Sequence, residues 1–486
     1  MGWYNTFLKA HECRKRPVSA LKIVMLRYVL LIKTYMNNQY WQKARQSRDA
    51  RFDGLFYVAV KSTGIYCRPI CPAPTAQEKN VVYYQYAHNA AQAGFRPCIR
   101  CRPDSAPGSA AWQGVKTTAL RAKQLIDLGD SCNCEMLATR LGITSRYLRR
   151  IFNQHFGVSV TQYRLFNQCQ FAKKLIQETT LPITDIAFAA GFKSVRRFND
   201  AFLQQLNIAP SKLRKSKKEA TPVIVLTLPF RPPYNWQALH SFLSKRLIEP
   251  MEWITPNSYG RTFKLKGAVG YFNAHFKVQN NHFKVEIVIN NTEHLQKVIN
   301  NIRRVLDVDA DINPIESHLK NSINGAFTLR EGLRLPGIWS SFEAGIRAVL
   351  GQQVSVGAAH TLVTKLVAER GDKHADKVYF PQPEDLATCD FEFFKMPQSR
   401  KNALKNLSKY CADNPDNRVL DNWLDIKGIG PWTVNYAKLR GQSNPDILLA
   451  GDLGVKKALI NAKQFNPELS APFRSYLTFQ LWQQLS

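Results

Sequence analysis

Long apolar runs are missing from this sequence. A helix that spans a bilayer needs about 20 consecutive apolar residues, and the best candidate, residues 18–32, is interrupted by Lys22 and Arg27. No small-residue cleavage site accompanies this stretch, so a secretory signal peptide is not expected. We therefore predict a cytoplasmic protein with no membrane partner. Its ten cysteines should then be reduced, and paired cysteines indicate metal ligands or nucleophiles rather than disulfides.

Acidic residues are scarce as well. Asp and Glu number 36 against 67 Lys and Arg, which gives a formal net charge of +31. A basic excess spread over the whole chain favours a polyanionic partner, and double-stranded DNA is the first candidate because neutralised phosphates release counterions. A membrane surface, or charge that serves solubility alone, is the alternative. With 45% hydrophobic and 11% aromatic residues, the chain can still form several packed cores.

The length of 486 residues predicts several domains rather than one core. Changes in periodicity and composition mark the boundaries. The predicted segments are an extension of unknown role at 1–36, a strand- and cysteine-rich domain at 37–110, a helical domain at 111–216, a mixed α/β domain at 221–320 and a second helical domain at 325–486. The predicted fold class is multidomain α+β, with a small zinc-bound α/β domain first, an all-α double helix-turn-helix next, then a mixed α/β domain and an all-α domain.

Four cysteines form two pairs at metal-ligand spacing, Cys67-x3-Cys71 and Cys98-x2-Cys101. Four thiolates suit tetrahedral Zn²⁺, and such a site often does no more than hold a small domain together. A zinc-bound thiolate also stays deprotonated at neutral pH, so it can act as a nucleophile, and positive charge lies beside these four. The neighbouring arginines are Arg68, Arg96, Arg100 and Arg102. The other cysteines are interpreted as ordinary: Cys13, Cys132, Cys134, Cys169, Cys389 and Cys411.

Residues 52–104 resemble the N-terminal domain of the Ada family, the regulators of the adaptive response to alkylation. The match includes TGIYCRP at 63–69 and GFRPC at 94–98. The resemblance implies that Cys67, the first of the four cysteines, takes a methyl group from a methylphosphotriester and makes the protein a stoichiometric methyltransferase. Transfer would remove one negative charge near DNA and so tighten phosphate binding. A zinc site without methyl transfer is the alternative.

Two similar segments predict a duplicated helix-turn-helix. LATRLGI at 137–143 precedes a basic helix that begins near Ser145, and IAFAAGF at 186–192 precedes another near Ser194. A recognition helix inserts its early residues into the major groove, which requires long polar side chains there. The candidates are Arg146, Arg149, Arg150, Arg196, Arg197 and Asn199, with Phe198 and Phe202 facing inward. A helical bundle with solvated arginines is the alternative.

Residues 112–214 resemble the AraC-type DNA-binding domain, which also follows the zinc domain in the Ada family. Gly142 and Gly191 match the glycine after the first helix of each unit. The resemblance implies binding to promoter DNA and regulation of transcription, with RNA polymerase as a partner if the protein is an activator.

LDIKGIGPWTV at 424–434 is a helix-hairpin-helix signature. Gly428 and Gly430 let the hairpin backbone approach DNA, and its amides can bind phosphate at the start of the next helix. Such a hairpin can serve as a DNA clamp alone. Asp452, however, lies twenty residues beyond Trp432. A carboxylate there could stabilise a sugar cation as a base leaves, or orient the attacking water. A helix-capping aspartate is the alternative.

Residues 227–482 resemble the AlkA family, the 3-methyladenine-DNA glycosylases II. Besides the hairpin, the match includes LPFRPPYNW at 228–236, RAVLGQQVSV at 347–356 and FRSY at 473–476. The resemblance makes Asp452 the catalytic residue and places a cationic alkylated purine among the rings of Trp432, Tyr436 and Trp482. Gln353 lies where the family inserts an apolar wedge into the gap left by a flipped base.

Trp432 occupies the position where related enzymes that nick DNA carry a lysine, so we expect no Schiff base and a monofunctional glycosylase. The Pro-Cys-His-Arg motif of the second Ada methyltransferase is missing, so repair of alkylated guanine oxygen is not predicted. The favoured hypothesis is a fused protein that excises alkylated bases, accepts methyl groups and regulates transcription. The competing hypothesis is a transcription regulator whose glycosylase region is an inactive DNA clamp.

Overall fold

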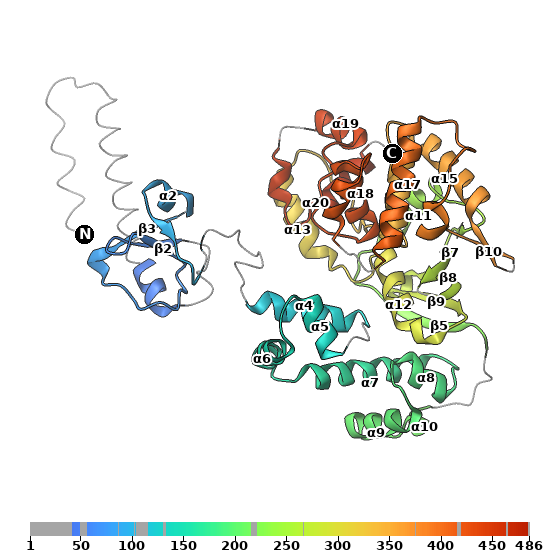
Figure 1. The fold of residues 1–486 in the computed structure, drawn as a ribbon, viewed down its shortest axis with the longest axis horizontal. Helices are drawn as coiled ribbons and strands as arrows, with labels where there is room; N and C mark the ends of the chain where they lie inside the picture. Colours follow the sequence, from blue (N-terminus) through green and yellow to red (C-terminus); the bar gives the residue numbers. More distant parts are fainter. Residues whose placement is uncertain are drawn as a thin grey trace, which may run out of the picture. The chain divides into compact units, whose positions relative to one another are not determined.

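In the computed structural model, the contacts divide the chain into two compact units, residues 1–124 with 132–159 and residues 125–131 with 160–486. Figure 1 shows the helices and strands coloured along the chain. In the part of the chain that the structure describes, no helix is both long and apolar enough to cross a membrane. The predicted extension 1–36, Cys13, Arg102 and Cys132 lie outside the described residues. Those residues are 41–48, 56–85, 87–101, 103, 115–129, 133–214, 221–265, 267–374, 376–415, 419–462 and 465–484.

The first unit contains a four-stranded sheet in the order β3-β1-β2-β4. Its elements are β1 (Tyr57–Val60), β2 (Ile65–Cys67), the 3-10 helix η2 (Glu78–Asn80), β3 (Val81–Tyr84), α2 (Ala87–Gln92) and β4 (Arg96–Pro97). Phe56 and Val58 pack in one small cluster with Ala44, whereas Tyr57 and Ala59 pack in another. Residues alternate between faces along a strand, which explains the two clusters.

The two halves of the helix-turn-helix region follow. The elements are α4 (Val115–Asp127), α5 (Cys134–Arg140) and α6 (Ser145–Phe156), and, in the second unit, α7 (Val160–Glu178), α8 (Ile183–Ala189), α9 (Val195–Leu206) and α10 (Pro210–Leu213). Thr144 and Ser194 cap α6 and α9, since each hydroxyl accepts a hydrogen bond from the amide three residues on. The predicted starts of these two helices are confirmed.

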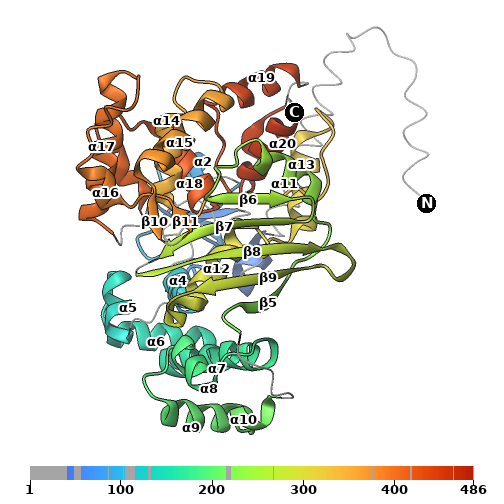
Figure 2. The same cartoon turned by 90° about the vertical axis from the view of Figure 1, so that its right-hand side faces the viewer.

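The second unit contains a five-stranded antiparallel sheet in the order β5-β9-β8-β7-β6 (Figure 2). Its strands are β5 (Ile224–Pro229), β6 (Glu252–Thr255), β7 (Ser258–Leu265), β8 (Ala268–Lys277) and β9 (His282–Ile289). The accompanying helices are α11 (Trp236–Ser244), η3 (Val278–Asn280), η4 (Thr292–His294), α12 (Leu295–Val305) and α13 (Ile312–Ile323). Helix α12 packs its apolar residues into the same core as the sheet.

Helix α7 covers the free edge of this sheet at β5. The amide of Thr227 donates to Glu178 (2.8 Å), and the Lys174 ammonium donates to the Thr227 carbonyl (2.9 Å). Unpaired edge groups invite strand addition from another chain, and charged side chains suppress it. Leu175 of α7 and Leu226 of β5 also belong to one hydrophobic core. The second helix-turn-helix half and the sheet therefore pack as one body.

The rest of the second unit is mainly helical. Its elements are α14 (Ser341–Leu350), α15 (Val356–Arg370), β10 (Asp372–His374), β11 (Lys377–Tyr379), α16 (Pro383–Ala387), α17 (Gln398–Asp413), η5 (Leu420–Asp425), α18 (Pro431–Gly441), α19 (Leu453–Asn461), η6 (Pro467–Ser470) and α20 (Arg474–Gln483). The expectation of an all-α region is wrong at the β10–β11 hairpin. Tyr379 is buried there, and the Val378 carbonyl accepts a hydrogen bond from Thr262 of β7, so tertiary packing stabilises this short hairpin.

Candidate functional site

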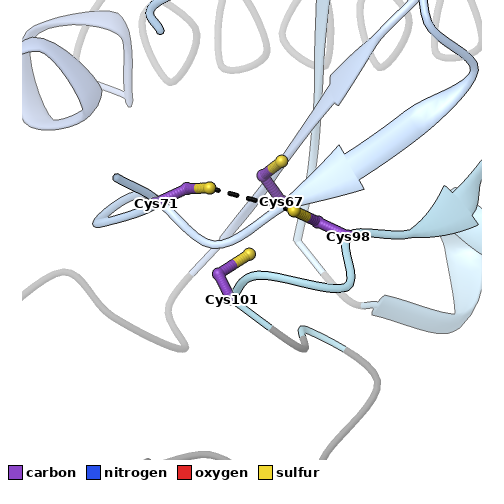
Figure 3. Close-up of side chains that lie close together, drawn as sticks. All are labelled: Cys67, Cys71, Cys98 and Cys101. Atoms are coloured by element: carbon purple, nitrogen blue, oxygen red, sulfur yellow. Dashed lines mark hydrogen bonds between the residues drawn. The ribbon is translucent and has the colours of Figure 1, made fainter. Parts of the chain in front are cut away.

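The four paired cysteines converge in the first unit (Figure 3). Strand β2 ends at Cys67, and its parallel pairing with β4, in which Tyr66 faces Pro97, brings Cys98 alongside. The four sulfur atoms all lie within 4.8 Å of one another, and the sulfurs of Cys71 and Cys98 are 4.0 Å apart. Zinc–sulfur bonds of about 2.3 Å in a tetrahedron require sulfur separations of about 3.8 Å. The cluster therefore has the size of a four-thiolate zinc site.

The negative charges of the four cysteine sulfurs favour a bound cation. Hydrogen bonding with Cys101 raises the pKa of the Cys67 thiol, whereas hydrogen bonding with Cys101 lowers the pKa of Cys71 to about 2. Four thiolates at these separations would repel one another, and a divalent cation removes this repulsion. Cys67 is half-buried, whereas its three partners are buried, so Cys67 is the accessible sulfur. The Arg68 amide donates to the Cys101 sulfur (3.3 Å).

A second site is a pocket of about 840 Å³ in the second unit. Its wall comes from α11, the turn between α14 and α15, α18, the loop before α19, and α20. The structure brings four of the predicted residues together in this wall: Trp432, Tyr436, Asp452 and Trp482. Trp432 and Tyr436 lie one turn apart on α18, and their rings stack at 5.4 Å with an interplanar angle of 28°. Aromatic faces of this kind suit a planar ligand.

Asp452 both caps α19 and faces the pocket. Its Oδ1 accepts hydrogen bonds from the amides of Gly454 (2.9 Å) and Val455 (3.1 Å), and a third from the indole nitrogen of Trp482 (2.9 Å). Gly454 leaves room for this approach, since a Cβ there would lie 3.2 Å from the Trp482 ring and 3.1 Å from Oδ1 of Asp452, so both groups would have to move slightly. The capping interpretation and the pocket interpretation of Asp452 are therefore compatible. The capping bonds fix the direction of the carboxylate.

The loop that carries Asp452 is anchored by α20. The Ser475 hydroxyl accepts from the amide of Ile447 (2.9 Å), and Arg474 forms a two-point ion pair with Asp446, with distances of 2.7 and 2.9 Å. The hydrogen bond from Arg474 lowers the pKa of Asp446, which keeps this pair charged. Fixed side chains around a reacting group are a general requirement of preorganised sites. Residues 473–476, quoted above from the sequence, thus act as a support for the loop.

The hairpin lies next to the pocket. Gly428 has a φ of +95°, and a Cβ at this position would come within 2.6 Å of the Ala403 Cβ, so a side chain is excluded there. Gly430 is the N-cap of α18. Gln353 is exposed at the rim with a φ of +56°, a backbone conformation that few residues other than glycine adopt. Its neighbour Gln352 donates to the Thr433 hydroxyl (3.2 Å), which links the turn to the hairpin helix.

Sequence patterns did not indicate several residues of the pocket wall, Phe242 and Arg246 among them. Phe242 and Arg246 come from α11 and the residues after it, far from Asp452 in the chain. The Phe242 ring stacks on Trp482 with centroids 6.1 Å apart and an angle of 19°. Neither residue stands in a motif, and no local pattern could have identified them. Their role follows from the way α11 packs against α20.

The predicted DNA-reading side chains are all exposed. Arg146, Arg149 and Arg150 project from α6 in the first unit. Arg196, Arg197 and Asn199 project from α9 in the second unit. Phe198 and Phe202 are buried on the opposite face of α9, as the sequence predicts. Each helix therefore presents a polar face to solvent.

Comparison with known proteins places this arrangement in a family. Residues 39–104 match the metal-binding domain of Ada, residues 137–216 a helix-turn-helix domain, and residues 225–340 the AlkA N-terminal domain. A Mycobacterium tuberculosis protein named probable bifunctional transcriptional activator/DNA repair enzyme AlkA is 34% identical over 91% of this chain and 95% of its own length. The chain belongs to this family of bifunctional activators and repair enzymes.

Two further relatives each cover one part of this Ada–AlkA fusion. The Escherichia coli DNA-3-methyladenine glycosylase 2 is 29% identical over 53% of this chain and 96% of its own length. The crystal structure of a methylated N-Ada/DNA complex matches 27% of this chain and 97% of that chain, with 34% identity and a TM-score of 0.23. The fusion architecture and the Zn²⁺ cofactor predicted from the sequence are confirmed. An inactive, clamp-only glycosylase region is not favoured.

Removal of zinc should unfold the cysteine domain selectively. Its apolar clusters are small, centred on Tyr57 and Tyr66 on one side and Phe56 on the other, so the metal supplies much of its stability. We expect a chelator to abolish the thermal transition of this domain while leaving that of the glycosylase region within about 2 °C, and added zinc to restore it. Differential scanning calorimetry and hydrogen exchange of residues 56–101 measure both. A domain that keeps its protection after complete zinc loss would contradict this.

Proposed function

We propose that this Ada–AlkA fusion excises alkylated bases, 3-methyladenine among them, by hydrolysis of the N-glycosidic bond. The observation that carries the proposal is the position of Asp452, held by three hydrogen bonds in a pocket lined by Trp432, Tyr436 and Trp482. A base extruded from the duplex would stack among these rings, and a positively charged base would be attracted to their faces. The carboxylate would stabilise the oxocarbenium character of the sugar as the base leaves.

The surrounding residues support a single hydrolytic step. Trp432 occupies the place of the lysine that would form a Schiff base, so water is the nucleophile and the enzyme is monofunctional. The hairpin at Gly428 and Gly430 would bind the DNA backbone through its amides. The exposed Gln353, in a strained backbone conformation at the rim, would fill the gap in the duplex.

Within the same proposal, Cys67 accepts a methyl group from a methylphosphotriester. Its sulfur is the half-buried one of the four, and Arg96 and Arg100 lie exposed on the neighbouring segment. The zinc ion would keep this sulfur deprotonated and therefore nucleophilic. The sulfur attacks the methyl carbon, the carbon–oxygen bond breaks, and the phosphate regains its negative charge. The thioether product carries one negative charge less, so the domain should bind DNA phosphates more tightly.

The two helix-turn-helix units would then read promoter DNA. Exposed arginines on α6 and α9 can reach base edges and phosphates, as the side chains of recognition helices usually do. We extend the proposal to alkylated and promoter DNA as the ligands and to RNA polymerase as the partner of the activator. We also propose domain boundaries at 37–110, 111–216, 221–320 and 325–486. The matched ranges 39–104 and 137–216 lie within the first two of these segments, whereas the AlkA N-terminal match at 225–340 runs past the proposed boundary at 320. A location in the cytoplasm stays a prediction.

One incubation tests the whole proposal. Full-length protein is mixed with duplex DNA that carries both methylated bases and methylphosphotriesters, and free bases and protein-bound methyl groups are counted in the same sample. We expect catalytic release of 3-methyladenine and at most one methyl group per chain. Bound methyl without base release would support a regulator with an inert clamp, whereas base release without bound methyl would leave Cys67 a zinc ligand alone.

A further inference from the structure

Three arginine side chains line the pocket, and two of them form ion pairs or hydrogen bonds with other groups of the protein. Arg347 pairs with two buried carboxylates, since its Nη2 lies 2.7 Å from Glu343 and 3.0 Å from Glu252. Arg440 is buried, and it donates from Nε to a backbone carbonyl (2.6 Å) and from Nη1 to the Tyr436 hydroxyl (3.3 Å). Both guanidinium groups therefore serve the architecture of the pocket.

The third, Arg246, is placed differently. Its guanidinium lies 3.9 Å from the centroid of the Phe242 ring, and Nη1 donates to the Phe242 carbonyl (3.2 Å). The ion pairs found among the described residues include Arg347 but not Arg246. Burial lowers the pKa of Arg246 to about 10, although the nearby Asp452 carboxylate acts in the opposite direction, so the group stays charged at neutral pH. The pocket therefore holds the charged guanidinium of Arg246, which has hydrogen-bond donors left for a ligand.

Such a cation does not help a positively charged lesion. A base methylated at a ring nitrogen carries positive charge in DNA and leaves as a neutral molecule, so it needs no donor when the bond breaks. An uncharged purine leaves with the bonding electron pair and becomes an anion. Charge that develops on the departing group is stabilised by preorganised donors in a site that excludes water. Arg246 has the charge and the location for this task.

We propose that Arg246 is a specificity-determining residue that extends the pocket to uncharged purine lesions with a carbonyl oxygen. Its guanidinium would donate to the oxygen and the adjacent ring nitrogen of the flipped base, a two-point arrangement that suits arginine. The inference rests on the proposed role of Asp452 in the same pocket. It assigns to Arg246 a contact with the leaving group that methylated cationic bases do not require.

The reaction balances without any further reagent. The bond between C1′ and the purine nitrogen breaks, and both electrons go to the base. The Asp452 carboxylate faces the cationic sugar, and a water molecule adds its oxygen to C1′ and releases a proton to solvent. The purine anion, held by Arg246, takes up a proton from solvent. One water is consumed, and a free base and an abasic sugar are formed.

Single-turnover excision by the full-length protein tests this inference with two substrates. Wild type, Arg246→Met and Arg370→Met are compared on duplexes that contain 3-methyladenine or hypoxanthine, the uncharged base with a carbonyl group. Methionine retains an apolar stem over Phe242. Arg370 is exposed, is not among the residues that line the pocket, and has its guanidinium over the Phe393 ring (5.9 Å), so its replacement removes the same charge elsewhere and is the matched control. Loss of a charged hydrogen bond should slow hypoxanthine release by roughly 10- to 100-fold in Arg246→Met and leave 3-methyladenine release within about twofold.

Each other outcome overturns the inference. Equal loss on both substrates would make Arg246 a packing residue, and unchanged rates on both would remove it from the reaction. An equal hypoxanthine defect in Arg370→Met would assign the effect to overall charge. Wild-type protein that releases 3-methyladenine but no hypoxanthine would refute the inference alone. Wild-type protein that releases neither base would refute the proposed function itself.

Discussion

Replacement of Asp452 by asparagine should abolish the release of 3-methyladenine, with a fall of at least about 10²- to 10³-fold in the single-turnover rate. The amide carbonyl of asparagine can still accept hydrogen bonds from Gly454, Val455 and Trp482, so α19 keeps its cap and the pocket keeps its shape. What is lost is the negative charge that faces the sugar cation. Quantitation of free base from methylated DNA measures the effect.

The control for this variant is Asp390→Asn. Asp390 is exposed, and its carboxylate also accepts a hydrogen bond from a backbone amide, that of Glu392 (3.2 Å), so the chemical change is the same outside the pocket. Asp390→Asn should excise at the wild-type rate, and both variants should bind DNA as wild type does. Normal excision by Asp452→Asn would remove this carboxylate from the mechanism.

Replacement of Cys67 should eliminate methyl transfer to the protein. After incubation with DNA that contains methylphosphotriesters, intact-mass spectrometry should show one added methyl group on wild type and none on Cys67→Ser. The physical reason is that Cys67 is the half-buried sulfur of the cluster, whereas its three partners are enclosed. Release of 3-methyladenine should be unchanged, because that reaction belongs to the pocket at Asp452.

Two further variants separate chemistry from folding. Cys67→His offers a three-cysteine, one-histidine ligand set that zinc accepts, so the domain should retain metal while the nucleophile is gone. Cys134→Ser alters a half-buried cysteine outside the cluster and should be methylated like wild type. Methylation of zinc-loaded Cys67→His would show that another group is the acceptor.

Local spacing allowed the sequence to predict much of both sites. Two residues separate Cys98 from Cys101, and a turn of this length suffices to direct both sulfurs to one metal ion. The hairpin likewise depends on backbone freedom at Gly428, where φ is +95°. The starts of α6 and α9 follow from capping by Thr144 and Ser194. In each case the determining interaction joins residues close together in the chain.

Other features arose from contacts between distant segments. Arg246 and Phe242 reach the pocket because α11 packs against α20, and no motif contains either residue. The β10–β11 hairpin forms where Val378 meets β7, although the surrounding segments are helical. Helix α7 covers the β5 edge through hydrogen bonds to Thr227. Residues of the second helix-turn-helix half and of the glycosylase sheet also belong to one hydrophobic core.

The sequence by itself determined the four-cysteine cluster, the glycine hairpin, the aspartate beyond it and the arginine-bearing helices α6 and α9, because each is set by side-chain type and by spacing over a few residues. Only the tertiary structure decided that Cys67 is the accessible sulfur and that the carboxylate of Asp452 faces the rings. It alone placed the Arg246 guanidinium, which is in no ion pair found among the described residues, in the same pocket as that carboxylate. Those properties depend on burial and on the packing of distant elements, which spacing along a chain does not encode.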